Sequence, residues 1–248
     1  TDMSADKYVM YVAAPNPLDL LREAVQTIPG AGFLQCYGMT ETTGTIAMLP
    51  PEDHALDGNQ RMRSAGKAVP GAELKVVGED GGELPCGEVG ELICKSPSNM
   101  IGYWNLPDAT RGALKDGWMH TGDAAYMDED GYVYIQDRIK DMIISGGENV
   151  YPAQVESAIY GHPAVSEVAV IGVPDETWGE AVKACVVPKP GTTVDPDDII
   201  AFTREQLAGF KVPKTVEVID AMPRNPSGKI LRRELRAPYW EGRDRQVN

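Results

Sequence analysis

Apolar and polar positions follow three different patterns along the chain, and the first lies near its start. Residues 8–13 are apolar with too little alternation for a half-exposed strand, which predicts a buried strand. Apolar residues at helical spacing follow over residues 21–28, and Pro29-Gly30 ends that predicted helix. Residues 33–35 predict a short strand that leads into a loop at residues 36–45. Together these segments predict a strand–helix–strand unit of an α/β sheet, in which loops after strands commonly hold ligands.

Between residues 60 and 136 the pattern changes to short strands separated by turn sequences. Strands are predicted at residues 72–77, 89–94 and 132–136. The turn sequences between them are Glu79-Asp80-Gly81-Gly82 and Asp128-Glu129-Asp130-Gly131. This alternation predicts a small β-barrel or sandwich.

From Ile139 onward, strands alternate with helices. Helices are predicted to begin at Pro152 and at Pro196, the second with Asp195 as its N-cap. Strands are predicted at residues 142–144, 168–171, 182–187 and 216–219. Such a series can form a self-sufficient α+β domain, so we place a domain boundary at Lys140. The predicted domains are residues 1–139, made of an α/β unit (1–59) and a β-barrel-like part (60–139), and residues 140–248.

Composition and charge narrow the class of protein. With 42% hydrophobic and 24% charged residues among 248, the chain is globular and fits one large domain or two modest ones. A formal net charge of −14 without a basic run argues against nucleic acid as a partner and gives no electrostatic support to membrane binding. No apolar run reaches the roughly 18 residues that a transmembrane helix needs. The four cysteines lack Cys-x-x-Cys spacing, which favours a reducing, cytoplasmic location.

Two common kinds of site are excluded by spacing. His54, His120 and His162 have no His or Cys partner at metal-ligand spacing, so each is interpreted as a surface or capping residue and a zinc site is set aside. The pairs Gly66-Lys67 and Gly228-Lys229 lack the upstream glycine of a phosphate-binding P-loop. The chain is therefore not predicted to be a P-loop NTPase.

Five loops combine small residues with single polar groups, and each by itself leaves two interpretations open. Residues 35–44 either meet a nucleotide and Mg²⁺ or form an ordinary loop, while Asp123 either binds ribose hydroxyls or caps a turn. Residues 137–141 are either functional or a solvated turn between domains, and residues 145–149 are either a hairpin or a close approach of backbone to a ligand. Lys229 is either an anion clamp or a surface lysine.

Taken in order, these loops resemble the later motifs of the adenylate-forming superfamily, which contains acyl-CoA synthetases, firefly-luciferase-like enzymes and the adenylation domains of peptide synthetases. The matching motifs are Tyr37-Gly38-Met39-Thr40-Glu41, Gly90-Glu91-Leu92, Gly102-Tyr103-Trp104-Asn105, Thr121-Gly122-Asp123, Asp137 to Asp141 with Gly146-Gly147 and Pro152, and Pro223 to Lys229. The resemblance covers essentially the whole chain, and residues 140–152 look most like bacterial fatty-acid-CoA ligases. It implies a mixed α/β fold, in which the C-terminal part of a large adenylation domain precedes a small, mobile α+β domain.

The resemblance also implies an activity: an AMP-forming acid–thiol ligase that uses ATP, Mg²⁺ and coenzyme A to convert a fatty, apolar carboxylic acid into its acyl-CoA. It assigns ATP or AMP binding to Gln35, Tyr37, Gly38, Thr40, Asp123, Arg138 and Lys140. Within that set Tyr37 would stack on adenine, Thr40 would bond the α-phosphate, and Asp123 with Arg138 would bind the ribose. Glu41 would help to hold Mg²⁺. Lys229 would be the catalytic residue, and removal of such a donor typically costs ~10²–10³ in rate.

In the second half-reaction of the family, the small domain rotates about a hinge, here Lys140. The rotation would withdraw Lys229 and bring Gly146 and Gly147 against the pantetheine arm of CoA. Cys36 stands where relatives commonly have Gly, and Gln136-Asp137 replaces a Gly-Arg style opening, which favours the fatty-acid and coumarate-type branch. Apolar walls of the acyl pocket are expected from Ala13, Ala14 and residues 45–48.

Several expectations concern the extent and the partners of the chain. It begins at Thr1 without Met and lacks the family's Ser/Thr/Gly-rich phosphate loop, so we expect the C-terminal half of such an enzyme, with little or no ligase activity by itself. Two other functions stay open: an acyl-AMP ligase that loads a carrier protein, and a non-catalytic nucleotide-binding fragment. A homodimer and a weak peripheral membrane contact also stay open, and the identity of the acid is not predicted.

Overall fold

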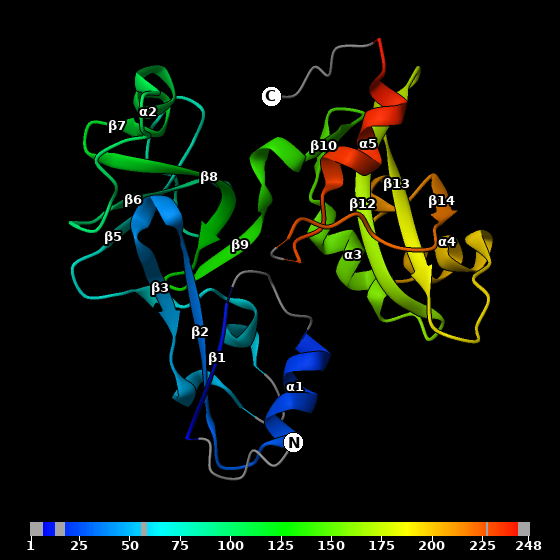
Figure 1. Ribbon diagram of the computed structural model, residues 1–248, viewed down its shortest axis with the longest axis horizontal. Coiled ribbons are helices and arrows are strands. Elements are labelled where there is room, and N and C mark those ends of the chain that lie inside the picture. Colours follow the sequence, from blue (N-terminus) through cyan, green and yellow to red (C-terminus); the bar gives the residue numbers. More distant parts are fainter. Residues whose placement is uncertain (1–6, 13–17, 56–58, 227, 243–248) are drawn as a thin grey trace. The chain divides into compact units, whose positions relative to one another are not determined.

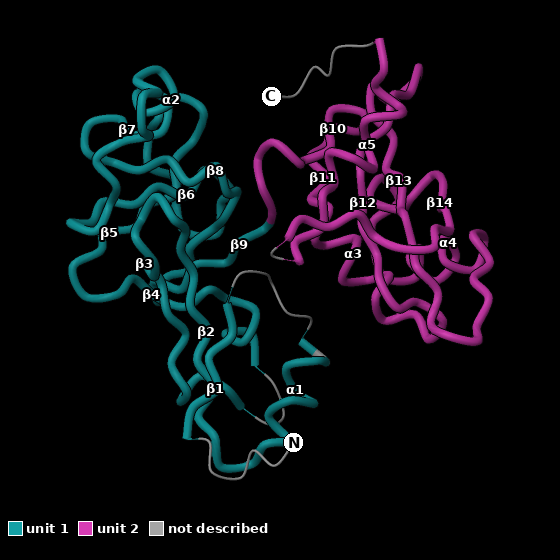
Figure 2. The backbone as a smooth tube through the Cα atoms, viewed as in Figure 1, with its two compact units in different colours: residues 1–136 teal, residues 137–248 magenta. Residues whose placement is uncertain are grey.

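The strand–helix–strand pattern near the start of the sequence forms β1 (Tyr8–Tyr11), α1 (Leu18–Thr27) and β2 (Gly32–Met39) in the computed structural model (Figure 1). The structure describes residues 7–12, 18–55, 59–226 and 228–242. The chain divides into two units, residues 1–136 and 137–248 (Figure 2). The assignment of these units to the large and small domains of a larger enzyme stays a prediction.

The first sheet of unit 1 is built on a parallel pair. Within the described residues its order is β1-β2-β3-β4, with β3 at Gly44–Leu49 and β4 at Lys67–Ala68. β1 and β2 run parallel, and the other neighbours are antiparallel. Leu21 of α1 and Phe33 of β2 are buried together with Met62, which confirms the predicted α/β unit.

Two predictions for this sheet are wrong in detail. Residues 36–39 continue β2 instead of starting a loop, because β3 pairs back onto them across a short 3₁₀ helix, η1 (Thr40–Thr42). Gly38 permits this close pairing, since a Cβ there would lie 1.8 Å from the Gly44 carbonyl oxygen. β1 is not a buried strand: Tyr8 and Met10 are 67% and 63% exposed, because only the opposite face of the strand packs against the α1 cluster.

The rest of unit 1 forms a second sheet from residues that the sequence shows as short strands. Its described members are β5 (Glu73–Val77), β6 (Gly90–Lys95), β7 (Leu114–Lys115), β8 (Trp118–Met127) and β9 (Val133–Arg138), with α2 (Pro107–Ala113) before β7. β8 pairs with β6, β7 and β9. Residues 117–123, interpreted from sequence as a turn, lie mostly within β8. Its partner β6 changes register between Glu91 and Ile93 at this point.

Unit 2 is a sheet whose two faces are covered by different helices. Its described strands are β10 (Ile143–Ser145), β11 (Glu148–Val150), β12 (Val165–Asp175), β13 (Gly179–Pro188) and β14 (Thr215–Val218). Its helices are α3 (Pro152–Tyr160), α4 (Pro196–Arg204) and α5 (Arg232–Trp240).

The strand period of two separates the two cores of unit 2 along β12. Val170 belongs to the core with α3 and α4, whereas Ala169 and Ile171 face Leu235 of α5. The predicted start of α4 is confirmed, because the Asp195 side chain accepts a hydrogen bond from the Asp197 N–H at 3.0 Å.

Candidate functional site

Tyr37 and Asp123 are brought together from the two sheets of unit 1. The Tyr37 hydroxyl donates a hydrogen bond of 2.5 Å to Asp123 Oδ2. Asp123 is only 4% exposed, and Tyr37 packs against the buried cluster that contains Leu92 and Ala125. A carboxylate held in this way keeps a fixed orientation and has further acceptor positions, so the pair can present one aromatic face and one anion to a ligand.

Asp123 is supported by Thr121 and by Glu91, which the sequence placed in family motifs without assigning either of them a role. The backbone N–H of Asp123 donates to Thr121 Oγ1 at 3.1 Å, and that hydroxyl donates to the Leu92 carbonyl at 2.7 Å. Glu91 accepts from the Gly122 N–H at 3.0 Å and lies 2.7 Å from a ring nitrogen of His120. His120 is therefore a half-buried partner of Glu91. The sequence signal for this arrangement was the family motif Gly90-Glu91-Leu92, which does not indicate the contact of Glu91 with His120.

Thr40 and Glu41 lie in η1, at the tip of the β2–β3 hairpin. Glu41 Oε1 accepts a hydrogen bond of 2.9 Å from the Tyr103 hydroxyl, and the Glu41 carbonyl accepts from the Met100 N–H at 2.7 Å. Buried Thr42 closes the hairpin, because its hydroxyl donates to the Gly44 carbonyl at 2.7 Å and accepts a hydrogen bond from the Met39 N–H at 3.1 Å. Thr40 stays exposed. The tip thus holds one hydroxyl and one carboxylate on a short, fixed turn.

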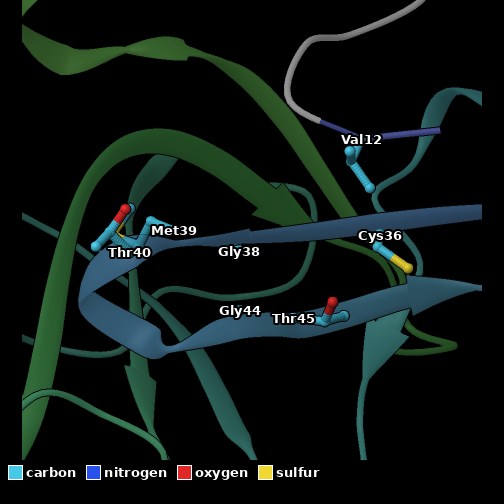
Figure 3. A pocket seen from close by; sticks show the side chains of 7 residues that line it. All are labelled: Val12, Cys36, Gly38, Met39, Thr40, Gly44 and Thr45. Carbon is cyan, nitrogen blue, oxygen red and sulfur yellow. The ribbon is translucent and has the colours of Figure 1, made fainter. Parts of the chain in front are cut away.

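A pocket of about 330 Å³ lies along this hairpin (Figure 3). Cys36 and Thr45 reach it from the neighbouring strands β2 and β3, and Val12 approaches from the end of β1. Of the residues expected to form apolar walls, Thr45 lines this pocket, while Ala13 and Ala14 lie outside the described residues. Ile46 and Ala47 are fully buried and belong to the protein core instead. Gln35 precedes the pocket in β2, paired with Tyr11 and Leu49.

In unit 2, the charged segment 137–141 is not the solvated turn that its composition indicated. Asp137 is 7% exposed, and its Oδ2 accepts a 2.7 Å hydrogen bond from the Ala153 N–H at the start of α3. Burial raises the pKa of Asp137 to about 6, although Arg232 and the donated N–H groups act in the opposite direction. Arg138 ends β9 and is half-buried, while Lys140 is exposed in the 3₁₀ helix η4 (Ile139–Asp141).

Gly146 and Gly147 form the turn between β10 and β11, so the predicted hairpin is present. Both have positive φ, at 63° and 85°. A Cβ on Gly146 would lie 2.7 Å from the Trp178 ring, whereas nothing lies within 4 Å of one on Gly147. The exposed backbone of Gly147 is therefore open to an approaching ligand.

Lys229 is exposed on a turn that leads into α5. Its N–H donates to Asn225 Oδ1 at 2.8 Å, and its carbonyl accepts from the Asn225 N–H at 3.0 Å. Arg224 donates to the Gly228 carbonyl and forms an ion pair with Glu167. Ser227 in the same turn lies outside the described residues. The turn fixes the Lys229 backbone and leaves its side chain in solvent.

The predicted site residues thus fall into two groups. Gln35, Tyr37, Gly38, Thr40, Glu41 and Asp123 belong to unit 1, and Arg138, Lys140, Gly146, Gly147 and Lys229 to unit 2. Asp123 contacts Tyr37, and Glu41 contacts Tyr103. Among the described residues no three His, Cys, Asp or Glu side chains converge as a metal cage, and no helix is long and apolar enough to cross a bilayer.

Two family models match the chain in order. The model of AMP-binding enzymes matches residues 1–104, and the model of the AMP-binding enzyme C-terminal domain matches residues 154–229. The first contains Tyr37, Thr40 and Glu41, and the second contains Gln154 through Lys229. The two matches together cover most of the chain.

Curated proteins and solved structures agree with these models. The chain is 49% identical over its whole length to the fatty acid–[acyl-carrier-protein] ligase ScoC of Streptomyces coeruleorubidus, of which it covers 47%. A long-chain-fatty-acid–CoA ligase of Escherichia coli is 46% identical over 84% of the chain, which covers 36% of that protein.

Among solved structures, the o-succinylbenzoate CoA synthetase (MenE) of Bacillus subtilis in complex with its acyl-adenylate intermediate superposes with a TM-score of 0.84. It is 38% identical, over 92% of this chain and 46% of that one. The chain spans about half the length of the curated ligase ScoC.

Proposed function

Because this chain belongs to the family of AMP-binding, adenylate-forming enzymes, we propose that its full-length protein is an acid–thiol ligase for a fatty, apolar carboxylic acid. In the first half-reaction, a carboxylate oxygen attacks the α-phosphorus of ATP. The bond between the α- and β-phosphates breaks, and pyrophosphate leaves as acyl-AMP forms. In the second, a thiol attacks the acyl carbonyl and loses its proton, the bond from the acyl carbon to the phosphate oxygen breaks, and AMP leaves as the thioester forms.

The observation that carries the proposal is the hairpin tip with its attached carboxylate. Tyr37, Thr40 and Glu41 lie on one short stretch of β2 and η1, and the 2.5 Å hydrogen bond from Tyr37 holds Asp123. In the proposed complex the Tyr37 ring stacks on adenine, Asp123 accepts from the ribose hydroxyls, and Thr40 donates to the α-phosphate. Gln35 and Gly38 line the same strand.

The donor set also fits Mg²⁺ held between protein and nucleotide. Mg²⁺ commonly binds proteins through one or two carboxylates, with phosphate oxygens and water in the other positions. Glu41 offers one carboxylate, which Tyr103 orients through a hydrogen bond of 2.9 Å to Oε1. When bound, the ion would neutralise charge on the phosphates of ATP. Glu41 would hold it beside Thr40.

Residues of unit 2 supply the cations and the thiol path in this proposal. Arg138 binds the ribose together with Asp123, and Lys229 stabilises the charge that develops between the carboxylate and the α-phosphate. Lys140 is the hinge, and rotation about it withdraws Lys229 before thiol attack. Gly146 and Gly147 then meet the pantetheine arm. Exposed backbone at positive φ supports this role, since no Cβ blocks Gly147.

The acceptor thiol is proposed to be that of CoA, and a carrier protein is the second candidate. The relative from Escherichia coli is named as a CoA ligase, and the relative from Streptomyces coeruleorubidus is named as a ligase for an acyl carrier protein. The apolar side chains of Val12, Cys36 and Met39 among the residues that line the pocket support an apolar acid.

The test is release of AMP by the full-length gene product with ATP and Mg²⁺, against acids from acetate to long-chain and aromatic, with and without CoA. The proposal expects CoA-dependent release that peaks at one class of apolar acid. Release that CoA does not accelerate would favour the carrier protein, and no release with any acid would favour a non-catalytic nucleotide-binding protein. The 248 residues by themselves are expected to form little or no acyl-CoA, because the family's phosphate loop is absent from them.

A further inference from the structure

Asp137 caps the N-terminus of α3, although the capping residue of a helix normally comes directly before it in sequence. α3 begins at Pro152, and its N-cap residue Tyr151 makes no side-chain cap. Asp137 takes that role from outside the helix, since its Oδ2 accepts from the Ala153 N–H at 2.7 Å and its Oδ1 accepts from the Arg138 N–H at 2.8 Å. A carboxylate at a helix N-terminus also complements the helix dipole. The end of β9 is thereby tied to α3.

The same segment is tied to α5 through one guanidinium. Arg232, the first residue of α5, makes hydrogen bonds of 2.8 and 2.6 Å with the two carboxylate oxygens of Glu156 in α3. Glu156 is itself fixed, because it accepts a 2.8 Å hydrogen bond from the Val170 N–H of β12. From this anchored position, Arg232 Nη1 lies 3.8 Å from Asp141 and 4.0 Å from Asp137. One cation therefore faces both acidic ends of segment 137–141.

Lys140, the proposed hinge, lies between these two acidic residues. A backbone rotation at Lys140 leaves Asp141 on the same side as Arg232, where Arg236 also holds it at 3.5 Å. Asp137 precedes the proposed hinge along the chain, so a rotation there would separate it from Arg232 and from Ala153. The contacts of Asp137 would then belong to one state of the proposed hinge, while those of Glu156 and Asp141 with Arg232 would belong to both.

The buried carboxyl group of Asp137 also lowers the free energy of unfolding when it is ionised, so the fold alone does not explain why this residue is an Asp. Its side chain is 4% exposed, and burial raises its pKa to about 6, so ionising this carboxyl group costs more free energy in the folded protein than in water. Asn or Ser caps a helix without a buried charge. Stability given up at one site is a common sign of a functional requirement there. The turn that carries Lys229 leads directly into α5 and its residue Arg232.

We propose that Asp137 is a positioning residue for adenylation: by capping α3 and facing Arg232, it latches the hinge segment 137–141 to the base of the Lys229 turn. The latch closes for the first half-reaction and opens when the hinge at Lys140 rotates for thiol attack. This inference rests on the proposed function, which supplies the two half-reactions. Arg232, anchored by Glu156, is the fixed side of the latch, and Asp137 is the side that leaves.

The experiment compares Asp137→Asn and Arg232→Lys with the wild type in the full-length protein. Asp220→Asn is the matched control, because it makes the same substitution at an exposed position of unit 2. Adenylation is followed by acid-dependent exchange of pyrophosphate into ATP, and the second half-reaction by thioester formation from supplied acyl-AMP and CoA. We expect both variants to lower the kcat of adenylation about tenfold, with KM for ATP unchanged. Thioester formation from acyl-AMP should be unchanged or faster with Asp137→Asn.

A purely structural cap gives a different result. Equal losses in both half-reactions, or no loss in either, would overturn the proposal. Amide hydrogen exchange without any substrate gives an independent readout: Asp137→Ala, which removes both the cap and the charge, should speed exchange at residues 138–142 and at the start of α3, and unchanged exchange there would refute the latch. If the wild type exchanges no pyrophosphate with any acid, the proposed function fails, and hydrogen exchange still tests whether Asp137 holds residues 138–142 to α3.

Discussion

The two units hold their candidate functional residues in opposite ways. In unit 1, Asp123 is 4% exposed and is fixed by the Tyr37 hydroxyl and by the Thr121 hydroxyl that its own backbone contacts. In unit 2, Lys229 is exposed, and the structure fixes its backbone through Asn225 while its amine reaches into solvent. The first arrangement fixes the functional side chain through hydrogen bonds within the protein. The second leaves a long cationic side chain to find its target.

This difference fits a division of labour between binding and catalysis. A rigid, buried pair is suited to groups that remain the same throughout the reaction, such as a base and a ribose, because no reorganisation is needed on binding. A cation on an exposed turn can be brought to a developing charge in one step and removed in the next. The following predictions test whether the two groups respond to substitution in these two ways.

The largest effect is expected at Lys229. Lys229→Ala should lower the kcat of adenylation by about 10²–10³-fold, because a cation that stabilises charge in the transition state is lost. KM for ATP should change little, since Lys229 is not expected to contribute to the binding of ATP before the reaction. Steady-state exchange of pyrophosphate into ATP by the full-length protein measures both constants.

Lys189→Ala is the matched control for Lys229, because it removes another exposed lysine from a turn of unit 2. Its kcat should equal that of the wild type. A Lys229→Ala variant with normal kcat and raised KM would reverse the comparison, since Lys229 would then act as a binding residue.

Substitution of Asp123 should change KM for ATP more than kcat, which is the opposite of the result expected for Lys229. Asp123→Asn removes a buried anion that receives hydrogen bonds, and such bonds to charged groups are worth about 1.5–3 kcal/mol. KM for ATP should rise about ten- to a hundredfold, with a smaller change in kcat. Tyr37→Phe keeps the ring and removes only the hydroxyl that orients Asp123, so its KM should rise less. Equal effects of the two substitutions would mean that orientation, and not charge, is what Asp123 contributes.

The sequence predicted unit 2 better than unit 1 for a physical reason. Its helices begin at Pro152 and Pro196, and its strands are continuous apolar runs, so local signals suffice. β8 was missed, because residues 118–123 mix Trp, His, Gly and Asp without alternation. Its strand conformation comes from pairing with β6, β7 and β9, which lie far apart in sequence. The extension of β2 to Met39 was missed for the same reason.

The candidate site shows the same limit. The motif residues could be found from their order along the chain, but their partners could not. Asp137 looked like part of a solvated turn, because its burial depends on α3 and on Arg232 near the end of the chain. Glu156 and Arg232 lie 76 positions apart, and neither stands in a recognisable motif with the other. Long-range ion pairs have no local signature in one sequence.

A smaller effect is expected from the Lys229 turn. Asn225→Ala removes the side-chain oxygen that accepts from the Lys229 N–H at 2.8 Å. A neutral hydrogen bond of this kind contributes about 1 kcal/mol, so the kcat of adenylation should fall roughly fivefold as the turn loosens. Asn225→Asp keeps an acceptor at the same position and should retain more of the activity. A rise in KM for ATP without a change in kcat would mean that Asn225 contributes to binding, as the candidate residues of unit 1 are expected to do.

The smallest effect concerns stability and distinguishes the buried anion of unit 2 from that of unit 1. Burial raises the pKa of Asp137 from 3.8 to about 6, and the titratable groups around it are Arg232 of α5, Glu156 of α3 and the neighbouring Tyr151. Between about pH 4 and pH 6 the folded protein binds the proton more tightly than the unfolded chain does. This contribution to stability is therefore complete below pH 3.8 and is lost as the pH rises through 6.

Asp137→Asn should unfold at the same temperature as the wild type near pH 4 and a few degrees higher near pH 7.5, as measured by calorimetry of the full-length protein. The exposed control Asp220→Asn should show no such divergence. If Asp137→Asn were instead less stable at pH 7.5, the ionised carboxylate would stabilise unit 2, and its persistence would need no functional explanation.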